Sequence, residues 1–388
     1  MSSVIQGAGG RNISLVTSGA HRSIHDDKTL VNADKDVAVL PYSSGTTGLP
    51  KGVMVTHANL AAAFMQFSDP RTLITSPEDV QMVFLPFFHS LGFIMMFSAL
   101  FSQYTSVLLP RFTPEVFLKV IEEYKVTFFA AVPPVVLFLS QAPLVDKYDI
   151  SSLRRMFCAA APLSADLQDA LQKRTGGKLE VRQAYGMTES VAAISVSSGE
   201  NRIGSVGQIS GYMQVKIVDL ETQSALGPRK EGEICLRGPQ VTPGYYKNQV
   251  ATAETFDQEG WLRTGDVGYY DEDGFLYIVD RIKELIKYKG MQVAPAELEG
   301  LLLQHPEITD AAVVGRPDPR VGELPTAFVA AAPGAQLTQQ LVQDYIAVRV
   351  SDHKHLRGGV VFLEVIPRTS TGKIARKEVK QLAKELKQ

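Results

Sequence analysis

The feature that most constrains this chain is the stretch of residues 80–110, which contains no Asp, Glu, Lys or Arg. Residues 82–101 alone form an apolar run that is long enough to span a bilayer as a helix. However, Pro86 and Gly92 interrupt the stretch and His89 lies near its middle. The buried strands and helices of a parallel α/β core also read as continuous apolar runs. We therefore expect these residues to form the core of a globular domain and not a transmembrane helix.

Composition favours a globular protein with two or three domains. The 388 residues are 45% hydrophobic, which is enough to build large cores. The 39 Lys and Arg residues balance 41 Asp and Glu residues without a charged tail, so nucleic acid is not an expected partner. Cys158 and Cys235 fit neither a disulfide framework nor a metal-ligand spacing, which favours a reducing compartment. The sequence shows no secretory or peroxisomal signal, so we expect a cytoplasmic protein. Location in an organelle is the alternative.

Three successive patterns indicate the fold class. Residues 36–183 alternate β-rich and helical runs, which indicates βαβ units. After Gly199, short strands between turn residues indicate a small β-barrel or a twisted sheet. The strands expected there are 215–219, 232–237 and 275–279. Past Arg281 the chain reads as a compact α+β unit of about 105 residues. The expected class is α/β: a large N-terminal part with parallel-type sheets and a small barrel-like region, then a compact α+β C-terminal domain.

A first polar cluster follows a predicted strand at 36–42 and runs Ser43-Ser44-Gly45-Thr46-Thr47-Gly48-Leu49-Pro50-Lys51-Gly52. Glycines let backbone N–H groups face an anion, hydroxyls add donors and Lys51 adds a point charge, so polyphosphate is the natural ligand. The spacing is not that of a Walker A loop, which needs GxxxxGK[ST]. An ordinary flexible surface loop is the alternative.

A second cluster follows a predicted strand at 179–182 and runs Gln183-Ala184-Tyr185-Gly186-Met187-Thr188-Glu189-Ser190. The loop at the carboxyl end of a strand is where open α/β sheets bind ligands. Thr188 and Glu189 offer oxygen ligands to a hard cation, and the ring of Tyr185 is suited to stacking on a nucleobase. A simple turn followed by a helix cap is the alternative.

Further candidates lie toward the C-terminus. An acidic residue in Thr264-Gly265-Asp266 or Asp280-Arg281-Ile282-Lys283 is suited to a ribose diol. The run Lys287-Tyr288-Lys289-Gly290 is basic, although such runs are usually solvated strand faces. Residues 367–373 form a turn that delivers Lys373 just before a terminal helix, or only a helix start. The lone His89 is, by itself, more often a packing residue than a catalytic one.

The order of these clusters resembles the acyl-adenylate-forming (AMP-binding) superfamily, in the branch of acyl-CoA synthetases, 4-coumarate–CoA ligases and beetle luciferases. The matching segments are 42–53, 183–189, 260–266, 279–290 and 367–373. The resemblance covers about residues 36–387. It implies an AMP-binding domain at 36–280, a hinge at 281–283 and a C-terminal lid domain at 284–388, whereas residues 1–35 are atypical.

The resemblance implies a two-step ligation that uses ATP, Mg²⁺ and coenzyme A. A carboxylate attacks the α-phosphorus of ATP to give an acyl-adenylate and pyrophosphate, and the thiol of coenzyme A then displaces AMP. The residues implied in catalysis are Lys373, His89, Thr188 and Glu189, the last two also as metal ligands. Those implied in ATP and AMP binding are Ser43, Ser44, Gly45, Thr46, Thr47, Gly48, Lys51, Gln183, Ala184, Tyr185, Gly186, Thr188, Asp266, Arg281 and Lys373. Those implied in coenzyme A binding are Arg111, Lys287, Lys289 and Gly290.

The resemblance also implies a moving lid. Lys283 resembles the hinge about which the terminal domain reorients between the two steps. That domain would present Lys373 in the first step and residues 287–290 in the second. Lys373 would bridge the substrate carboxylate and the α-phosphate, and His89 would guard the acyl pocket and orient the carboxylate.

Two departures from the family pattern bear on function. Ser43 follows only 42 residues, whereas this branch normally places a long segment ahead of the loop. We therefore expect an N-terminally truncated chain that exposes apolar faces, self-associates or needs a partner. Leu91 stands where plant coumarate ligases have a tyrosine, which favours an apolar acid, fatty or aryl. An acid–thiol ligase is favoured; a luciferase-type adenylating monooxygenase and a catalytically silent isoform acting by association stay open.

Overall fold

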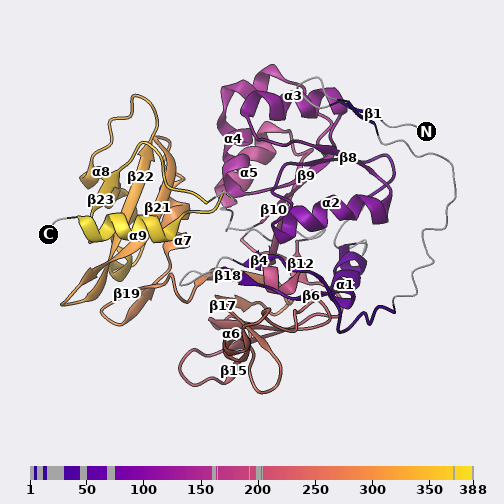
Figure 1. Ribbon diagram of the computed structural model, residues 1–388. Coiled ribbons are helices and arrows are strands. Elements are labelled where there is room, and N and C mark those ends of the chain that lie inside the picture. The colour runs from indigo at the N-terminus through magenta and orange to yellow at the C-terminus, as the bar shows by residue number, and fades with distance from the viewer. Residues whose placement is uncertain are drawn as a thin grey trace.

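The computed structural model consists of two units joined by a short turn (Figure 1). It describes residues 4–6, 12–14, 30–43, 50–67, 75–159, 163, 165–191, 193–197, 202, 204–369 and 372–386. The larger unit extends to β18 (Leu276–Arg281), and the smaller unit begins at β19 (Ile286–Tyr288). The smaller unit, orange to yellow in Figure 1, stands beside the larger one. The expected α/β class, with a large N-terminal part and a compact C-terminal part, is confirmed.

The larger unit is built on a seven-stranded sheet with the order β13-β12-β11-β10-β9-β7-β8. Its strands are β7 (Val80–Val83), β8 (Thr105–Leu108), β9 (Phe128–Ala131), β10 (Arg155–Cys158), β11 (Glu180–Gly186), β12 (Ala193–Val196) and β13 (Gln208–Ile209). Strands β7 to β11 pair in parallel, and β12 and β13 extend the sheet antiparallel at one edge. The parallel sheet expected from the βαβ alternation is therefore confirmed.

The stretch without charged residues folds as a β-α-β crossover of this sheet. Strand β7 leads into α2 (Ser90–Ser102), which returns the chain to β8, the parallel neighbour of β7. No helix in the described part of the chain is long and apolar enough to cross a membrane. Burial inside a layered α/β unit accounts for the missing charges. Phe88, Leu100 and Phe101 are nevertheless exposed, and the expected self-association stays a prediction.

Strand β9 shows how both faces of the sheet are buried, because successive side chains of a strand point to opposite faces. Phe129 and Ala131 pack in a core with α3 (Pro114–Tyr124), α4 (Pro133–Gln141) and α5 (Ala165–Arg174). Phe128 and Ala130 pack in the opposite core with α1 (His57–Phe67) and α2. The sheet therefore lies between two layers of helices (Figure 1).

Short strand pairs complete this part of the chain. Strand β1 (Val4–Gln6) pairs with β2 (Asn12–Ser14), β3 (Val37–Val39) with β6 (Val55–Thr56), and β4 (Tyr42–Ser43) with β5 (Lys51–Gly52). The single strand expected at 36–42 is wrong, because Pro41 has no N–H for a ladder and lies between two short strands. Helix α1 begins after Thr56, whose hydroxyl accepts the N–H of Asn59 at 3.2 Å.

The second sheet of the larger unit is antiparallel, with the order β15-β14-β16-β17-β18. Its remaining strands are β14 (Gln214–Val218), β15 (Ala225–Leu226), β16 (Gly232–Arg237) and β17 (Leu262–Tyr270), with α6 (Gln249–Thr255) between β16 and β17. The expected sheet is thus confirmed, whereas the pairings of the described residues do not show closure into a barrel. The sequence does not predict β17, because Thr264-Gly265-Asp266 reads as a turn and Gly265 has a φ of +71°.

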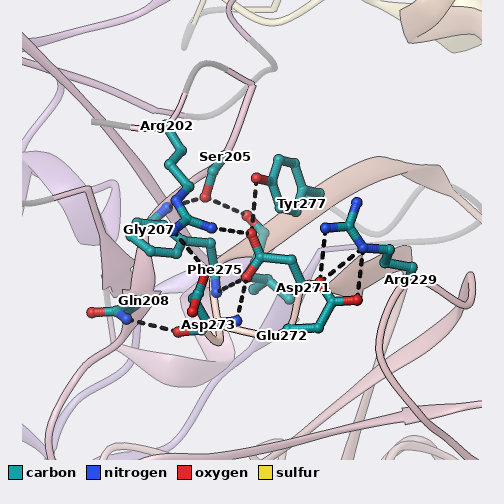
Figure 2. Close-up of polar contacts among 11 residues, drawn as sticks. Arg202, Ser205, Gly207, Gln208, Arg229, Asp271, Glu272, Asp273, Phe275 and Tyr277 are labelled. Carbon is teal, nitrogen blue, oxygen red and sulfur yellow. Dashed lines mark hydrogen bonds and ion pairs between the residues drawn. The ribbon is translucent and has the colours of Figure 1, made fainter. Parts of the chain in front are cut away.

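The turn between β17 and β18 is organised by Asp271 (Figure 2). This carboxylate is 4% exposed, and its Oδ1 accepts the backbone N–H groups of Asp273 at 3.1 Å and Phe275 at 2.9 Å. Its Oδ2 accepts from Arg202 at 2.8 Å and from the Tyr277 hydroxyl at 3.2 Å. Burial opposes ionisation, but these bonds hold the pKa of Asp271 below its usual range. Asp271 therefore connects this turn to Arg202, which lies in the segment before β13.

The turn has a consequence at the far end of the hairpin. With this register, Asp266 of β17 is the cross-strand partner of Arg281 in β18. A slip by one residue would carry Asp266 to the other face of the sheet. The Asp271 turn therefore helps to place the two residues that are predicted to hold the ribose.

Asp271→Ala should lower the free energy of unfolding by about 2 kcal/mol or more, because buried backbone donors lose their acceptor. Glu272→Ala is a matched control, since Glu272 pairs with Arg229 at the exposed tip of the same turn (Figure 2). That exposed pair should contribute nothing measurable. Urea unfolding of both variants and the wild type measures the difference. Equal stability of the two variants would show that the turn does not depend on Asp271.

The smaller unit has its own sheet, with the order β20-β19-β22-β21 and β23 parallel to β22. Its elements after β19 are β20 (Met291–Val293), α7 (Pro295–Leu302), β21 (Ile308–Asp318), β22 (Gly322–Ala331), α8 (Gln339–Ala347), β23 (Val360–Phe362) and α9 (Arg376–Glu385). Ala327 and Val329 of β22 pack with α7 and α8, while Phe328 and Ala330 pack with α9. This alternation gives the unit a core on each face of its sheet.

The turn between the units is held by packing and by hydrogen bonds. Val267 of β17 lies in an apolar cluster with Leu285 and Ala294, which follow the turn. The Oδ2 atom of Asp280, in β18, accepts the N–H of Ala296 at 2.9 Å in the first turn of α7. The smaller unit is therefore packed against β17 and β18 in this orientation.

Candidate active site

Asp266 lies in a polar group formed by β11, β17 and β18. It is 4% exposed, accepts a hydrogen bond from the Tyr185 hydroxyl at Oδ2 (2.7 Å) and pairs through Oδ1 with Arg281 Nε (3.1 Å). The Thr264 hydroxyl accepts the backbone N–H of Asp266 at 3.0 Å. Burial raises the pKa of Asp266, and Arg281 and Tyr185 oppose that rise. The carboxylate is therefore held in one orientation.

Glu189 lies on the short 3₁₀ turn η2 (Thr188–Ser190), which follows β11. Its side chain is buried, and its Oε1 accepts a hydrogen bond from the Tyr245 hydroxyl at 2.8 Å. The other carboxylate oxygen, Oε2, has no hydrogen-bond partner within the described residues. Burial, followed by the charge of Glu189, raises the pKa of Tyr245, so the tyrosine stays a donor across the neutral range.

Ser43 and Lys51 stand at the two ends of the predicted phosphate loop. They are Cα partners in the β4–β5 pair, and Lys51 Nζ lies 4.7 Å from the centre of the Tyr245 ring. The loop lysine and Glu189 therefore share one neighbour. The predicted loop residues that lie outside the described part of the chain are Ser44, Gly45, Thr46, Thr47 and Gly48.

His89 is the N-cap residue of α2. Its Nδ1 accepts the backbone N–H of Leu91 at 3.3 Å, so the neutral ring carries its proton on Nε2. Burial, followed by the charge of Lys373, lowers the pKa of His89 to about 4. At neutral pH, His89 is therefore an uncharged imidazole with an N–H donor at Nε2.

This shift predicts a pH effect on stability. Between the folded pKa of about 4 and the ordinary value of 6.5, the unfolded chain binds more protons at His89 than the folded chain. Stability should therefore fall as pH is lowered through that window and level off below it. His89→Asn keeps a helix cap but cannot titrate, so its melting temperature should fall less between pH 7 and pH 5. Parallel falls in both proteins would contradict the lowered pKa.

Lys373 is presented by a braced turn of the smaller unit. The Arg368 guanidinium forms two bonds with the carboxylate of Asp310, at 2.7 and 3.1 Å, and donates to the carbonyl oxygen of Gly372 at 2.6 Å. Gly372 has a φ of +82°, a conformation that favours glycine. The residue just before Lys373 is thus fixed to β21.

Electrostatic effects show which charged groups lie near Lys373. Burial, followed by the charge of Arg281, lowers the pKa of Lys373, while Asp266 and Glu189 raise it. Lys373 in turn lowers the pKa of His89. One ammonium group from the smaller unit therefore lies among four predicted site residues of the larger unit.

Comparisons with known proteins identify the family of this chain. Residues 7–246 match the family model described as AMP-binding enzyme. The chain belongs to the AMP-binding enzyme family. Residues 297–373 match the model of the AMP-binding enzyme C-terminal domain, and Lys373 is the last residue of that match. The resemblance inferred from the motif order is confirmed.

Relatives of this AMP-binding enzyme include two kinds of protein. The chain is 44% identical over 352 residues to probable 4-coumarate–CoA ligase 3 of Dictyostelium discoideum, covering 90% of this chain and 64% of that protein. It is 43% identical over 357 residues to luciferin 4-monooxygenase of Nipponoluciola cruciata, covering 92% and 65%. The chain therefore spans a little less than two thirds of the length of these relatives.

Solved structures share the fold. The ATP-bound MatB of Rhodopseudomonas palustris matches with a TM-score of 0.83 at 30% identity, covering 91% of this chain and 69% of that one. The o-succinylbenzoate CoA synthetase of Bacillus subtilis, in complex with its acyl-adenylate intermediate, matches with a TM-score of 0.78 at 31% identity, covering 90% and 70%. These proteins bind an adenine nucleotide or an acyl-adenylate.

The structure groups several predicted site residues and leaves others apart. Those that lie together are His89, Tyr185, Glu189, Asp266, Arg281 and Lys373. Gln183, Ala184, Gly186 and Thr188 flank Tyr185 and Glu189 along β11 and η2. Gln183 is buried, and its Nε2 has no partner within the described residues, so one amide donor is available there.

The predicted coenzyme A residues lie elsewhere. Lys287, Lys289 and Gly290 are exposed on the β19–β20 hairpin, at one edge of the sheet of the smaller unit. Arg111 is exposed after β8 of the larger unit. Lys283, the predicted hinge, is exposed in the turn between the units. In this orientation the smaller unit turns Lys373 toward the site, and not its basic hairpin.

No sequence motif identifies Tyr245, although its hydroxyl contacts Glu189 directly. The one nearby sequence feature that indicates a structural role for Tyr245 is the adjacent Gly244, in Pro243-Gly244-Tyr245-Tyr246. Gly244 has a φ of +141°, and a Cβ atom there would lie 2.5 Å from a side-chain atom of Thr252. A glycine that is required by close packing indicates that the next residue is held in place, but it does not reveal what that residue contacts.

Proposed function

We propose that this AMP-binding enzyme is an acid–thiol ligase, which activates a carboxylic acid with MgATP and transfers the acyl group to coenzyme A. The observation that carries the proposal is the position of Lys373 among His89, Asp266, Arg281 and Glu189. The relatives named 4-coumarate–CoA ligase and the synthetase solved with an acyl-adenylate support it.

In the first step, a carboxylate oxygen of the acid bonds to the α-phosphorus of ATP, and the bond to the bridging oxygen breaks, releasing pyrophosphate. Lys373 would lie between the carboxylate and the α-phosphate and stabilise the charge that grows there. His89, neutral with its proton on Nε2, would donate to the carboxylate. Asp266, held by Arg281, would accept hydrogen bonds from the ribose hydroxyls.

Residues 43–51 would hold the β- and γ-phosphates, and the Thr188 hydroxyl would contact a phosphate oxygen. Glu189 fits a Mg²⁺ site, because it is a buried carboxylate with one oxygen that lacks a partner in the described part of the chain. The described residues contain no cluster of three or more metal-ligating side chains, which suits an ion held mainly by phosphates and water. Mg²⁺ bound there would neutralise charge on the polyphosphate.

In the second step, the sulfur of coenzyme A bonds to the acyl carbon and AMP leaves with the electrons of the cleaved carbon–oxygen bond. We propose that the smaller unit first turns about Lys283, so that Lys287, Lys289 and Gly290 replace Lys373 at the site. Their exposure on the β19–β20 hairpin leaves them accessible to a ligand and supports such a turn. Arg111 would meet the nucleotide end of coenzyme A.

The acid is proposed to be apolar, either fatty or aryl. Leu91 on α2 offers no hydroxyl to a polar substrate. An apolar cavity of about 350 Å³ borders the turn that carries His89, and Phe87, Phe88 and Phe93 contribute to its walls. Most of the lining is apolar, with hydroxyl groups at Tyr42 and Ser90, so a substrate hydroxyl placed away from these two would lack a partner, at a cost in binding.

Formation of acyl-CoA tests the ligase proposal. The purified chain would be incubated with ATP, Mg²⁺, coenzyme A and single acids from a panel of fatty, cinnamic and hydroxycinnamic acids, and the products identified by mass spectrometry. We expect acyl-CoA and AMP, with fatty or unsubstituted aryl acids preferred over hydroxylated ones. Accumulation of acyl-adenylate without any thioester would rule out the thiol ligase.

A luciferase-type monooxygenase is the second candidate, because luciferin 4-monooxygenases are about as similar to this chain as the coumarate ligases. Light emission with luciferin, ATP and oxygen would favour it. Production of acyl-CoA without light would favour the ligase.

A further inference from the structure

Tyr245 lies between two residues that the proposed function needs. Its hydroxyl donates to Glu189 Oε1 at 2.8 Å, and the face of its ring lies 4.7 Å from Lys51 Nζ. The side chain is 6% exposed, so both contacts are made away from bulk water. A single buried residue therefore contacts both the candidate magnesium carboxylate and the lysine of the phosphate loop.

The backbone around Tyr245 connects the same two places. The N–H of Thr242 donates to the Glu189 carbonyl oxygen at 2.9 Å, and the N–H of Tyr246 donates to the Gly52 carbonyl oxygen at 2.8 Å. Tyr245 itself forms an antiparallel bridge with Val53, two residues after Lys51. Residues 242–246 thus bind η2 on one side and the end of the phosphate loop on the other.

We infer that Tyr245 is a positioning residue, which fixes Glu189 for Mg²⁺ and sets the distance between that carboxylate and Lys51. The inference rests on the proposed function and extends it to a residue outside the predicted site. Of the two carboxylate oxygens of Glu189, the Tyr245 hydroxyl contacts Oε1. The other oxygen, Oε2, therefore stays available to a cation. The ring offers its negative face to the Lys51 ammonium, which places that charge beside the carboxylate without a direct ion pair.

The hydroxyl and the ring have separable roles. Tyr245→Phe removes the hydrogen bond to Glu189 and keeps the ring under Lys51. Tyr246→Phe is the matched control, because it removes the same hydroxyl group from the neighbouring residue. Tyr246 is 47% exposed, and its hydroxyl does not bind Glu189. Tyr245→Leu removes both the hydroxyl and the aromatic face.

The test is equilibrium binding of ATP by isothermal titration calorimetry, with Mg²⁺ and with EDTA. For the wild type we expect Mg²⁺ to tighten ATP binding. In Tyr245→Phe that gain should fall by about tenfold, the size expected for one hydrogen bond to a charged group, while binding in EDTA is unchanged. Tyr246→Phe should match the wild type. Tyr245→Leu should also weaken binding in EDTA.

Measurements in a Glu189→Gln background, of the melting temperature and of wild-type MgATP binding distinguish a positioning role of Tyr245 from a structural one and from failure of the proposed function. In a Glu189→Gln background, Tyr245→Phe should change the Mg²⁺ gain by less than twofold, whereas an undiminished effect there would overturn the inference. An unaltered Mg²⁺ gain in Tyr245→Phe, with the wild type binding MgATP, would overturn the inference alone. In Tyr245→Phe, a loss of ATP affinity in EDTA together with a lowered melting temperature would show a merely structural role and overturn the inference. Failure of the wild type to bind MgATP would overturn the proposed function and the inference together.

Discussion

Lys373→Ala should lower the rate of acyl-adenylate formation by about a hundredfold or more, because the ammonium would stabilise charge that develops only in the transition state. In the structure it lies among Asp266, Glu189, Arg281 and His89. Thioester formation from a supplied acyl-adenylate should be much less affected. Pre-steady-state assays of the two half-reactions measure each effect separately.

Lys289→Ala is the matched variant, since it removes another lysine of the same unit. Lys289 is exposed on the β19–β20 hairpin, and its charge acts on Asp352 of the same unit. Its loss should slow thioester formation and spare adenylation. Equal losses of both half-reactions in both variants would contradict a smaller unit that presents two faces in turn.

Asp266→Asn should weaken ATP binding by about ten- to a hundredfold, because charge-assisted hydrogen bonds to the ribose would be lost. Asp266 is suited to that role because Tyr185 and Arg281 hold it in one orientation. Asp257→Asn is the control, since this carboxylate pairs with Lys216 before the start of β17. Nucleotide titration of both variants measures the change. An unaltered affinity in Asp266→Asn would remove this residue from the nucleotide site.

The parts of the site that the sequence predicts are those carried by contiguous motifs. Glu189 follows β11 directly, and Lys373 comes just before a terminal helix, so a short pattern identifies each residue. The apolar runs of β7 and β9 likewise predict a buried parallel sheet, because both faces of such a sheet are covered. The fold class and the family could therefore be inferred before the structure.

The parts that the sequence does not predict depend on contacts between distant segments. The hydroxyl of Tyr245 reaches Glu189 across 56 residues of chain, and nothing near either residue indicates the pairing. The sequence does not predict strand β17, because Gly265 and its neighbours have the composition of a turn. The pairing of Asp266 with Arg281 depends on a register that the Asp271 turn helps to set, and Asp271 in turn binds Arg202, 69 residues earlier in the chain. Such long-range hydrogen bonds leave no periodic pattern in the sequence.

Carboxylate-dependent exchange of labelled pyrophosphate into ATP tests the central claim, that the two units of this chain together form an adenylating site. The wild type, with Mg²⁺ and a suitable fatty or aryl acid, should incorporate label. Omission of the acid, or Lys373→Ala, should abolish incorporation. If folded wild-type protein showed no exchange with any acid of the panel, the account of this site as an acyl-adenylating centre would be contradicted.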